Sequence, residues 1–179
     1  MYKKKFEACL KRVQKPARYI GNEFNSIHKE MTPDMMSFAF CFPDVYEVGM
    51  SHLGIKILYH LMNEWEDTVC ERVFAPWDDM EQEMKREGIP LLSLESYTPV
   101  REFDMVGFTL QYEMSYSNIV NMLKLAGIPL RTREREIGDP FVCCGGPCAY
   151  HAEPLSDLVD FFILGEGEDI MREIMQAYK

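Results

Sequence analysis

Short, largely apolar runs separated by amphipathic stretches dominate the chain after its first 36 residues. A run of this kind is typical of a strand that is buried on both faces of a sheet. Five runs predict five strands, at residues 37–42, 69–74, 105–110, 141–144 and 161–164. A weaker run predicts a further short strand at 91–94.

The stretches between these runs have the spacing of helices. One helix is predicted to begin at Ser51, a residue type that favours the N-cap position. Its apolar face is marked by Leu53, Ile57, Leu58 and Leu61. Further helices are predicted at 77–86, 115–125 and 168–179.

Strands that alternate with helices predict an α/β fold with right-handed crossover connections. We expect a doubly wound, mainly parallel five-stranded sheet with a flavodoxin-like, Rossmann-type strand order over residues 37–179. Ligands of such sheets bind above the carboxyl ends of the strands. Residues 1–36 are predicted to form an N-terminal extension with a short helix near 6–13.

Charge and composition narrow the classes of partner. The net charge of −10 over 179 residues argues against a general nucleic-acid or anionic-membrane surface, because phosphates attract Lys and Arg. The one basic cluster, at 131–135, is expected to be a solvated loop. No membrane-length apolar run and no signal core are present, so the six cysteines are expected to be reduced thiols in a cytoplasmic protein.

The loops after the predicted strands are rich in glycine. Gly145-Gly146-Pro147 and Gly165-Glu166-Gly167-Glu168 each follow a strand. Glycine lets a backbone approach a ligand closely, but it also serves in tight turns without any ligand. Together with Gly49 and Gly54 after the first strand, these glycine-bearing loops at one edge favour a ligand that lies flat across the sheet edge.

These loops resemble those of the cobalamin-binding domains that are fused to radical S-adenosylmethionine (SAM) enzymes, and an uncharacterised bacterial subgroup in particular. Asp44-x-Tyr46-x-x-Gly49 occupies the frame of that family's Asp-x-His-x-x-Gly loop. Val106-Gly107-Phe108-Thr109 is similar to the strand whose hydroxyl lies near the nucleotide tail of the cofactor. The resemblance implies a set of cofactor-binding residues: Asp44, Tyr46, Gly49, Ser51, Thr109, Gln111, Gly145, Gly146, Gly165, Glu166 and Gly167.

Tyr46 stands where the family has the histidine that ligates cobalt. A phenol with a pKa near 10 is a poor ligand at neutral pH, so cobalamin is expected to bind without a lower His ligand. His52 lies six residues further on and is expected to cap a helix or to lie on the surface. Glu168 is expected to favour a helix start, whereas Glu166 would contact the ligand or a further domain.

A metal site within this chain is a less favoured alternative. Cys144 and Cys148 begin the Cys-x3-Cys-x2-Cys motif of radical SAM clusters, but His151 stands at its third position. Thiolate and imidazole could together hold iron or zinc. We expect structural thiols instead, and the resemblance implies that the 4Fe-4S cluster and SAM belong to a downstream radical SAM domain outside this chain.

The resemblance therefore implies a cobalamin-binding-like module whose partner is that downstream domain of the same polypeptide. The full protein would be an iron–sulfur radical SAM enzyme of oxidoreductase type, and this chain alone would be catalytically silent. Two alternatives stay open. One is a structural or docking domain that has lost cobalamin, and the other is a flavodoxin-like nucleotide or flavin binder. Asp44 and Glu47 argue against a phosphate in the first loop.

Overall fold

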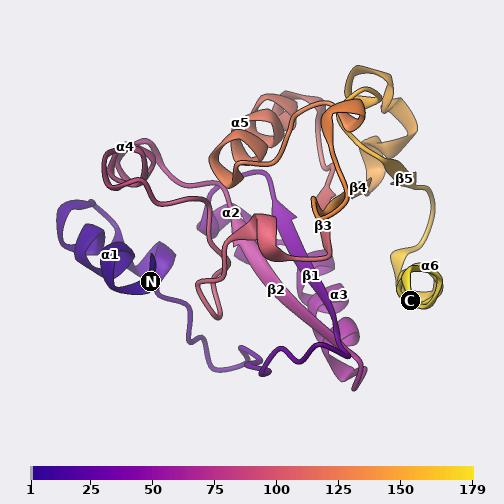
Figure 1. Cartoon of the computed structure of the whole chain (residues 1–179), viewed down its shortest axis with the longest axis horizontal. Coiled ribbons are helices and arrows are strands. Elements are labelled where there is room, and N and C mark those ends of the chain that lie inside the picture. Colours follow the sequence, from indigo (N-terminus) through magenta and orange to yellow (C-terminus); the bar gives the residue numbers. More distant parts are fainter. Residues whose placement is uncertain (1) are drawn as a thin grey trace.

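The computed structural model describes residues 2–179 and has a five-stranded sheet at its centre (Figure 1). The strands are β1 Met36–Phe42, β2 Thr68–Phe74, β3 Met105–Thr109, β4 Phe141–Gly145 and β5 Phe161–Ile163. Every pairing is parallel, and the spatial order is β2-β1-β3-β4-β5. The predicted α/β fold with a flavodoxin-like strand order is confirmed.

Helices cover both faces of this sheet. They are α1 Tyr2–Cys9, α2 Tyr46–Ser51, α3 Leu53–Glu64, α4 Asp78–Glu87, α5 Tyr116–Ala126 and α6 Gly167–Tyr178. Short 3-10 turns lie at Leu10–Arg12, Pro16–Tyr19, Val100–Glu102, Glu113–Ser115, Thr132–Glu134, Pro147–His151 and Glu153–Leu155. Helices α4 and α5 end at Gly88 and Gly127, which both adopt the left-handed conformation that favours glycine.

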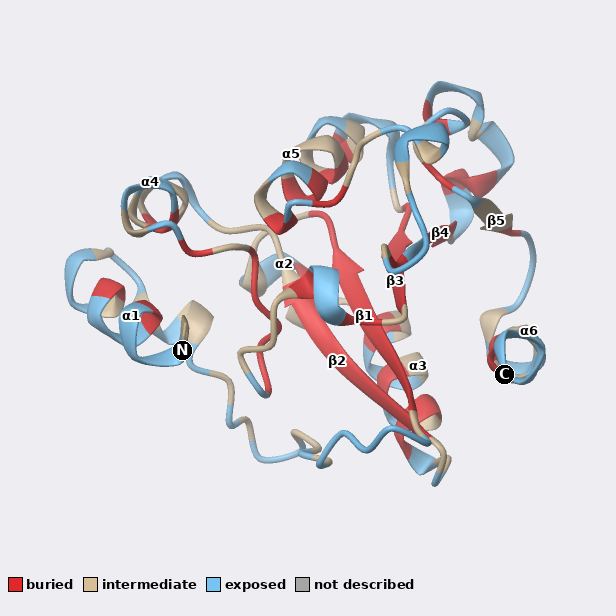
Figure 2. Cartoon of the chain, in the orientation of Figure 1, coloured by how far each residue is buried: buried red, intermediate tan, exposed pale blue. Residues whose placement is uncertain are grey.

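Alternate residues of each strand divide the core into two clusters, because successive side chains of a strand point to opposite faces. Ala39 and Cys41 of β1 pack in one cluster with apolar residues of α1, α4 and α5. Phe38 and Phe40 pack in the other cluster with residues of α3 and α6. Figure 2 shows β1, β2 and β3 buried between the two helical layers, while the outer surfaces of the helices are exposed.

The N-terminal extension is joined to the domain by packing and by ion pairs. Phe6 of α1 is buried in the same cluster as α4 and α5. Further along, Glu23 pairs with Arg72 of β2 at 2.7 Å, and the Ile27 amide donates to the Tyr59 hydroxyl at 2.7 Å. The helix predicted near 6–13 is present but begins earlier, at Tyr2, and continues as a 3-10 turn to Arg12.

The prediction of a strand at 91–94 was wrong. This segment makes only an isolated bridge between Leu92 and Pro99. Its Leu94 amide donates to the Arg72 carbonyl at 2.8 Å, and the Glu95 carboxylate accepts the Arg72 amide at 2.7 Å. The Glu95 carboxylate therefore takes the place of the backbone carbonyl that a neighbouring strand would offer to the Arg72 amide. The segment covers the free edge of β2 without extending the sheet.

Two smaller expectations also need correction. Ser51 is the last residue of α2 and its hydroxyl donates to the Val48 carbonyl, so it does not cap α3. In the basic loop, Arg131 and Arg133 are exposed as expected, but the Arg135 side chain is only 6% exposed and pairs with Asp160 at 2.6 Å. No helix of residues 2–179 is long and apolar enough to cross a membrane.

Candidate cofactor-binding site

A cavity of about 190 Å³ lies between the sheet and the helices α3 and α6. The strand order reverses between β1 and β3, and in open parallel sheets ligands bind beside such a switch point. The cavity extends from the loops at the carboxyl edge down to the rings of Phe38 and Phe40. Its wall residues are Phe38, Phe40, His52, Gly54, Ile55, Leu58, Met62, Gly107, Phe108, Thr109, Gln111, Cys143, Gly145, Gly146, Ile163, Gly165, Gly167, Glu168 and Met171.

Glycines make room for this cavity in two ways. At Gly107 in β3, a Cβ atom would lie 2.3 Å from the Phe38 ring, so only glycine lets that ring lie across the strand. At Gly146 the backbone φ is +105°, and a Cβ atom would lie 2.9 Å from the Leu110 carbonyl. The loop after β4 can therefore pass close to the end of β3 only with glycine at this position.

A row of three polar side chains crosses the wall at the carboxyl edge. The His52 Nε2 atom lies 3.0 Å from the Gln111 Oε1 atom. The Gln111 amide Nε2 donates to the Thr109 hydroxyl at 2.6 Å. These residues come from the α2–α3 junction and from the end of β3, and they give one polar side to a cavity whose other walls are mainly apolar.

Six of the eleven residues implied by the resemblance line the cavity together. They are Thr109, Gln111, Gly145, Gly146, Gly165 and Gly167. The other five do not line it: Asp44, Tyr46, Gly49, Ser51 and Glu166. Glu168 of the first turn of α6 lines the cavity, although Glu166 was the glutamate expected to meet a ligand.

The loop after β1 is held away from the cavity by its own partners. The Asp44 carboxylate accepts the Tyr112 hydroxyl at 2.7 Å. The Tyr46 hydroxyl donates to Glu23 at 2.6 Å, and its ring packs edge-on against Phe74 with the centroids 5.4 Å apart. Burial, together with the hydrogen bond to Glu23, raises the pKa of Tyr46 to about 12. Tyr46 is therefore a neutral phenol committed to the N-terminal extension.

His52 is the functional candidate that sequence reasoning missed. It was expected to cap a helix or to lie on the surface, but its side chain makes no capping hydrogen bond and lines the cavity. The short helix α2 shifts the start of α3 and turns His52 toward Gln111. Gly54 was the feature of the sequence that could have indicated this position, since a Cβ atom there would lie 3.0 Å from the His52 imidazole.

Beside Tyr46, a buried ion network joins the extension to β2. Arg72 pairs with Glu95 at 2.6 Å and with Glu23 at 2.7 Å, and its guanidinium lies 4.6 Å from the centre of the Tyr59 ring. Burial raises the pKa of Glu95 to about 7, although the attraction of Arg72 opposes that rise. The hydrogen bonds from Tyr46 and Arg72 lower the pKa of Glu23 despite its partial burial.

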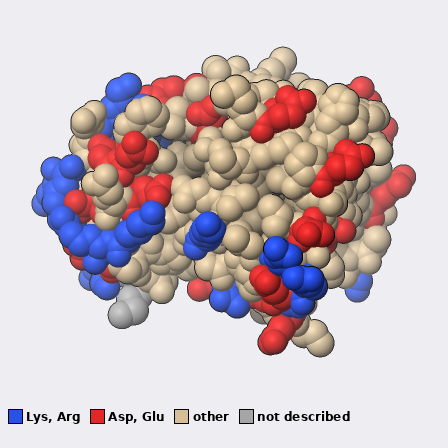
Figure 3. All heavy atoms as spheres, turned by 90° about the horizontal axis from the view of Figure 1, so that it is seen from above, with Lys and Arg blue, Asp and Glu red and all other residues tan. Residues whose placement is uncertain are grey.

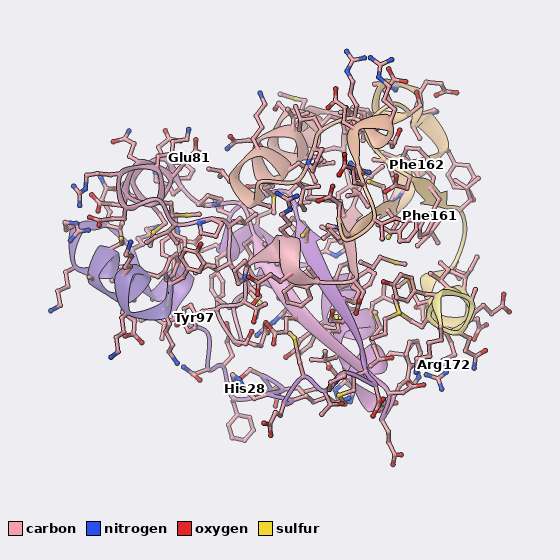
Figure 4. The ribbon with its side chains drawn as sticks, viewed as in Figure 1. His28, Glu81, Tyr97, Phe161, Phe162 and Arg172 are labelled. Atoms are coloured by element: carbon pink, nitrogen blue, oxygen red, sulfur yellow. The ribbon has the colours of Figure 1, made fainter. Side chains whose placement is uncertain are left out.

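Helix α6 is clamped beside the cavity by its charged residues. Arg172, labelled in Figure 4, pairs with Asp67 at 2.8 Å and lies 4.9 Å from the centre of the Trp65 ring. Lys179 also pairs with Asp67, at 2.7 Å, and the two cations hold the pKa of that carboxyl well below its usual range. These contacts fix α6 against the turn that connects α3 and β2.

Cys144, Cys148 and His151 do not come together as one group of potential metal ligands in the part of the chain that the structure describes. No group of three or more His, Cys, Asp or Glu side chains there could hold a metal ion. Cys144 is buried within β4, whereas His151 is exposed and lies 3.6 Å from Glu113. Cys143 lines the cavity, and burial raises the pKa of its thiol to about 12.

Exposed apolar side chains gather around the cavity, beside the acidic residues Glu166 of the last loop and Glu168 of α6. Five exposed apolar residues, here called the carboxyl-edge rim, follow the ends of the strands: Val48, Leu53, Met114, Tyr150 and Leu164. Figure 3 views this edge from above and shows a broad, mainly uncharged area over its middle, with charged side chains of both signs around it.

In doubly wound sheets of this kind, a cavity beside the switch point is the usual place for a ligand. Comparison with known families gives the class more closely: the family described as radical SAM proteins, N-terminal, matches residues 54–179. The chain belongs to this family.

An uncharacterised protein of Methanocaldococcus jannaschii is 26% identical over 140 residues, which are 76% of this chain and 26% of that protein. The chain thus spans about a quarter of the length of that relative. No solved structure matches the chain. The predicted link to radical SAM proteins is confirmed at the level of the family, while cobalamin binding and the bacterial subgroup stay predictions.

Proposed function

We propose that this chain is the cobalamin-binding module of a radical SAM protein and that the cavity holds the nucleotide tail of cobalamin. The observation that carries the proposal is the wall formed jointly by Thr109, Gly145 and Gly146, the residues that resemble the tail-binding positions of the family. Gly165 and Gly167 of the last loop complete this wall.

The size of the cavity supports the binding of part of a larger ligand. Sites that enclose a whole drug-sized molecule measure roughly 300–1,000 Å³. A cavity of about 190 Å³ suits one flat bicyclic ring and leaves the rest of the ligand outside. A tail inserted here would leave the corrin ring over the carboxyl-edge rim, where the exposed apolar side chains of Leu53, Met114 and Leu164 could pack against it.

The residues present fit a cobalamin without a lower histidine ligand. Tyr46 is neutral and donates to Glu23, so it offers cobalt no nitrogen and no phenolate. His52 does not substitute for the missing ligand in this geometry, because its Nε2 atom is engaged with Gln111 and its Nδ1 atom is buried. Bound cobalamin would supply a cobalt centre able to carry an alkyl group, and this chain would bind and orient it.

In this proposal the whole protein is a radical SAM enzyme whose iron–sulfur cluster and SAM site lie in a further domain. That domain would be the partner of this chain and would approach the cofactor from the carboxyl edge. The chain alone would then bind the cofactor without catalysing a reaction.

The experiment is a titration of the purified chain with hydroxocobalamin, followed by absorbance and calorimetry, in the wild type and in Gly145→Val. Gly145 faces the cavity from β4, its Cβ position is 3.5 Å from Ile163, and valine suits a strand. We expect saturable one-to-one binding that Gly145→Val abolishes. Ser117→Ala, on the exposed surface of α5 across the sheet, is the matched control and should bind as the wild type does.

Two outcomes favour the alternatives. A folded wild-type chain that binds no hydroxocobalamin would favour the structural or docking domain. Saturable binding of flavin mononucleotide in a parallel titration, in the absence of cobalamin binding, would favour a flavodoxin-like binder.

A further inference from the structure

The polar row of the cavity wall, His52, Gln111 and Thr109, has a fixed order of hydrogen-bond donors and acceptors. The position of the proton on the His52 imidazole sets that order. The Nδ1 atom of His52 is buried and has no hydrogen-bond partner among residues 2–179. A neutral imidazole carries its proton on one of its two nitrogens. A proton on Nδ1 would bury an N–H without an acceptor, and orphaned buried N–H groups are rarer than orphaned acceptors. The proton therefore lies on Nε2.

The proton on Nε2 of His52 fixes which atoms of Gln111 and Thr109 donate and which accept. Nε2–H donates to the Gln111 carbonyl oxygen at 3.0 Å, so the Gln111 NH2 group points the other way, toward Thr109. The Thr109 oxygen accepts from that NH2 group at 2.6 Å. Among the residues that the structure describes, this is the one hydrogen bond of the Thr109 hydroxyl, so its proton is left free to donate into the cavity.

We propose that His52, acting through Gln111, fixes the Thr109 hydroxyl as a hydrogen-bond donor, so that the cavity selects flat bicyclic heterocycles with an unprotonated ring nitrogen. His52 is thus a positioning residue, and Thr109 is the group that meets the ligand. The inference rests on the proposed function only in placing a ring in this cavity, and it does not require that the ring belong to cobalamin.

The test compares two rings of the same shape, 1-methylbenzimidazole and 1-methylindole, which differ only in whether position 3 is an acceptor nitrogen or a carbon. Each is titrated into the wild-type chain at mildly alkaline pH, where both are uncharged, and binding is followed by NMR. One hydrogen bond predicts a preference of about three- to tenfold for 1-methylbenzimidazole. The ratio of affinities is the readout, since a general loss of structure would weaken both probes alike.

Three variants test the order of donors and acceptors from His52 through Gln111 to Thr109. Gln111→Glu replaces the NH2 donor with a carboxylate oxygen, which would accept the Thr109 proton and leave oxygen lone pairs facing the ligand. We expect the preference to reverse in this variant. His52→Leu removes the group that orients Gln111, and Thr109→Val removes the hydroxyl, so both should bring the ratio to about one. Lys56→Ala, on the exposed surface of α3, should keep the wild-type ratio.

Equal affinities in the wild type, or a wild-type ratio in His52→Leu, would overturn the inference, and so would a failure of both probes to bind. The result is separable from the cobalamin titration. A selective ring site in a chain that binds no cobalamin would overturn the proposed function alone. Cobalamin binding without ring selectivity would overturn the inference alone.

Discussion

The Tyr46 hydroxyl donates to the Glu23 carboxylate at 2.6 Å, which ties the residue in the lower-ligand frame to the N-terminal extension. Glu23 also pairs with Arg72, so the extension, the first loop and β2 share one polar network. Because this network occupies Tyr46, the first loop makes no contact with the cavity through that side chain.

Replacing Tyr46 with Phe tests whether this contact is structural. Hydrogen bonds to charged groups are worth roughly 1.5–3 kcal/mol, so the free energy of unfolding should fall by about that amount. Urea unfolding provides the measurement. Tyr112→Phe removes a similar bond, to Asp44, from an exposed tyrosine and should cost clearly less. Equal losses in the two variants would show that the Tyr46 bond is no stronger than a surface contact.

Among the charged residues, replacement of Arg72 should lower the free energy of unfolding the most. Its side chain is 5% exposed and pairs with both Glu95 and Glu23. At pH 8, above the pKa of Glu95, Arg72→Met would leave the buried Glu95 carboxylate without its partner, which typically costs about 3–5 kcal/mol. Arg133→Met, at an exposed position, should change the unfolding midpoint little. An unfolding midpoint of Arg72→Met close to that of the wild type would contradict this role.

The same network predicts a pH dependence of stability. Burial raises the folded-state pKa of Glu95 to about 7, well above the value of an exposed glutamate. The folded chain therefore holds a proton that the unfolded chain releases, and the stability from Glu95 is lost as the pH rises through about 7. Urea midpoints at several pH values between 5 and 8 should fall more steeply in the wild type than in Glu95→Gln. Parallel slopes for the two chains would argue against a raised pKa.

Gly107 and Phe38 should be coupled. A Cβ atom at Gly107 would lie 2.3 Å from the Phe38 ring, so Gly107→Ala forces that ring to move. Overpacking of this kind costs about 1–3 kcal/mol. Phe38→Leu in the same chain should recover part of the loss, and a double-mutant cycle measured by urea unfolding would give the coupling energy. Additive effects would mean that the two residues do not compete for space.

The apolar pattern predicted all five strands and their order, because strands buried on both faces have few polar positions and their connections are restricted. It failed at 91–94, where an apolar segment covers β2 through the Glu95 side chain. It also missed His52, since one short helix changed the direction of the chain between Tyr46 and Leu53.

For the site, the glycines were predictable because their loops follow adjacent strands and meet at one edge. The orientation of the Tyr46 side chain was not predictable, since it depends on a hydrogen bond to Glu23, which lies 23 residues earlier in the chain. A contact of that kind is set by tertiary packing, and no local spacing encodes it.

The central claim is that the cavity takes the nucleotide tail of cobalamin. Calorimetric titration with hydroxocobalamin and with cobinamide, which has the corrin ring but no nucleotide tail, tests it most directly. Burial of one bicyclic ring predicts that cobinamide binds at least about tenfold more weakly. Equal affinities for the two corrinoids, or no binding of hydroxocobalamin to the folded chain, would contradict the account.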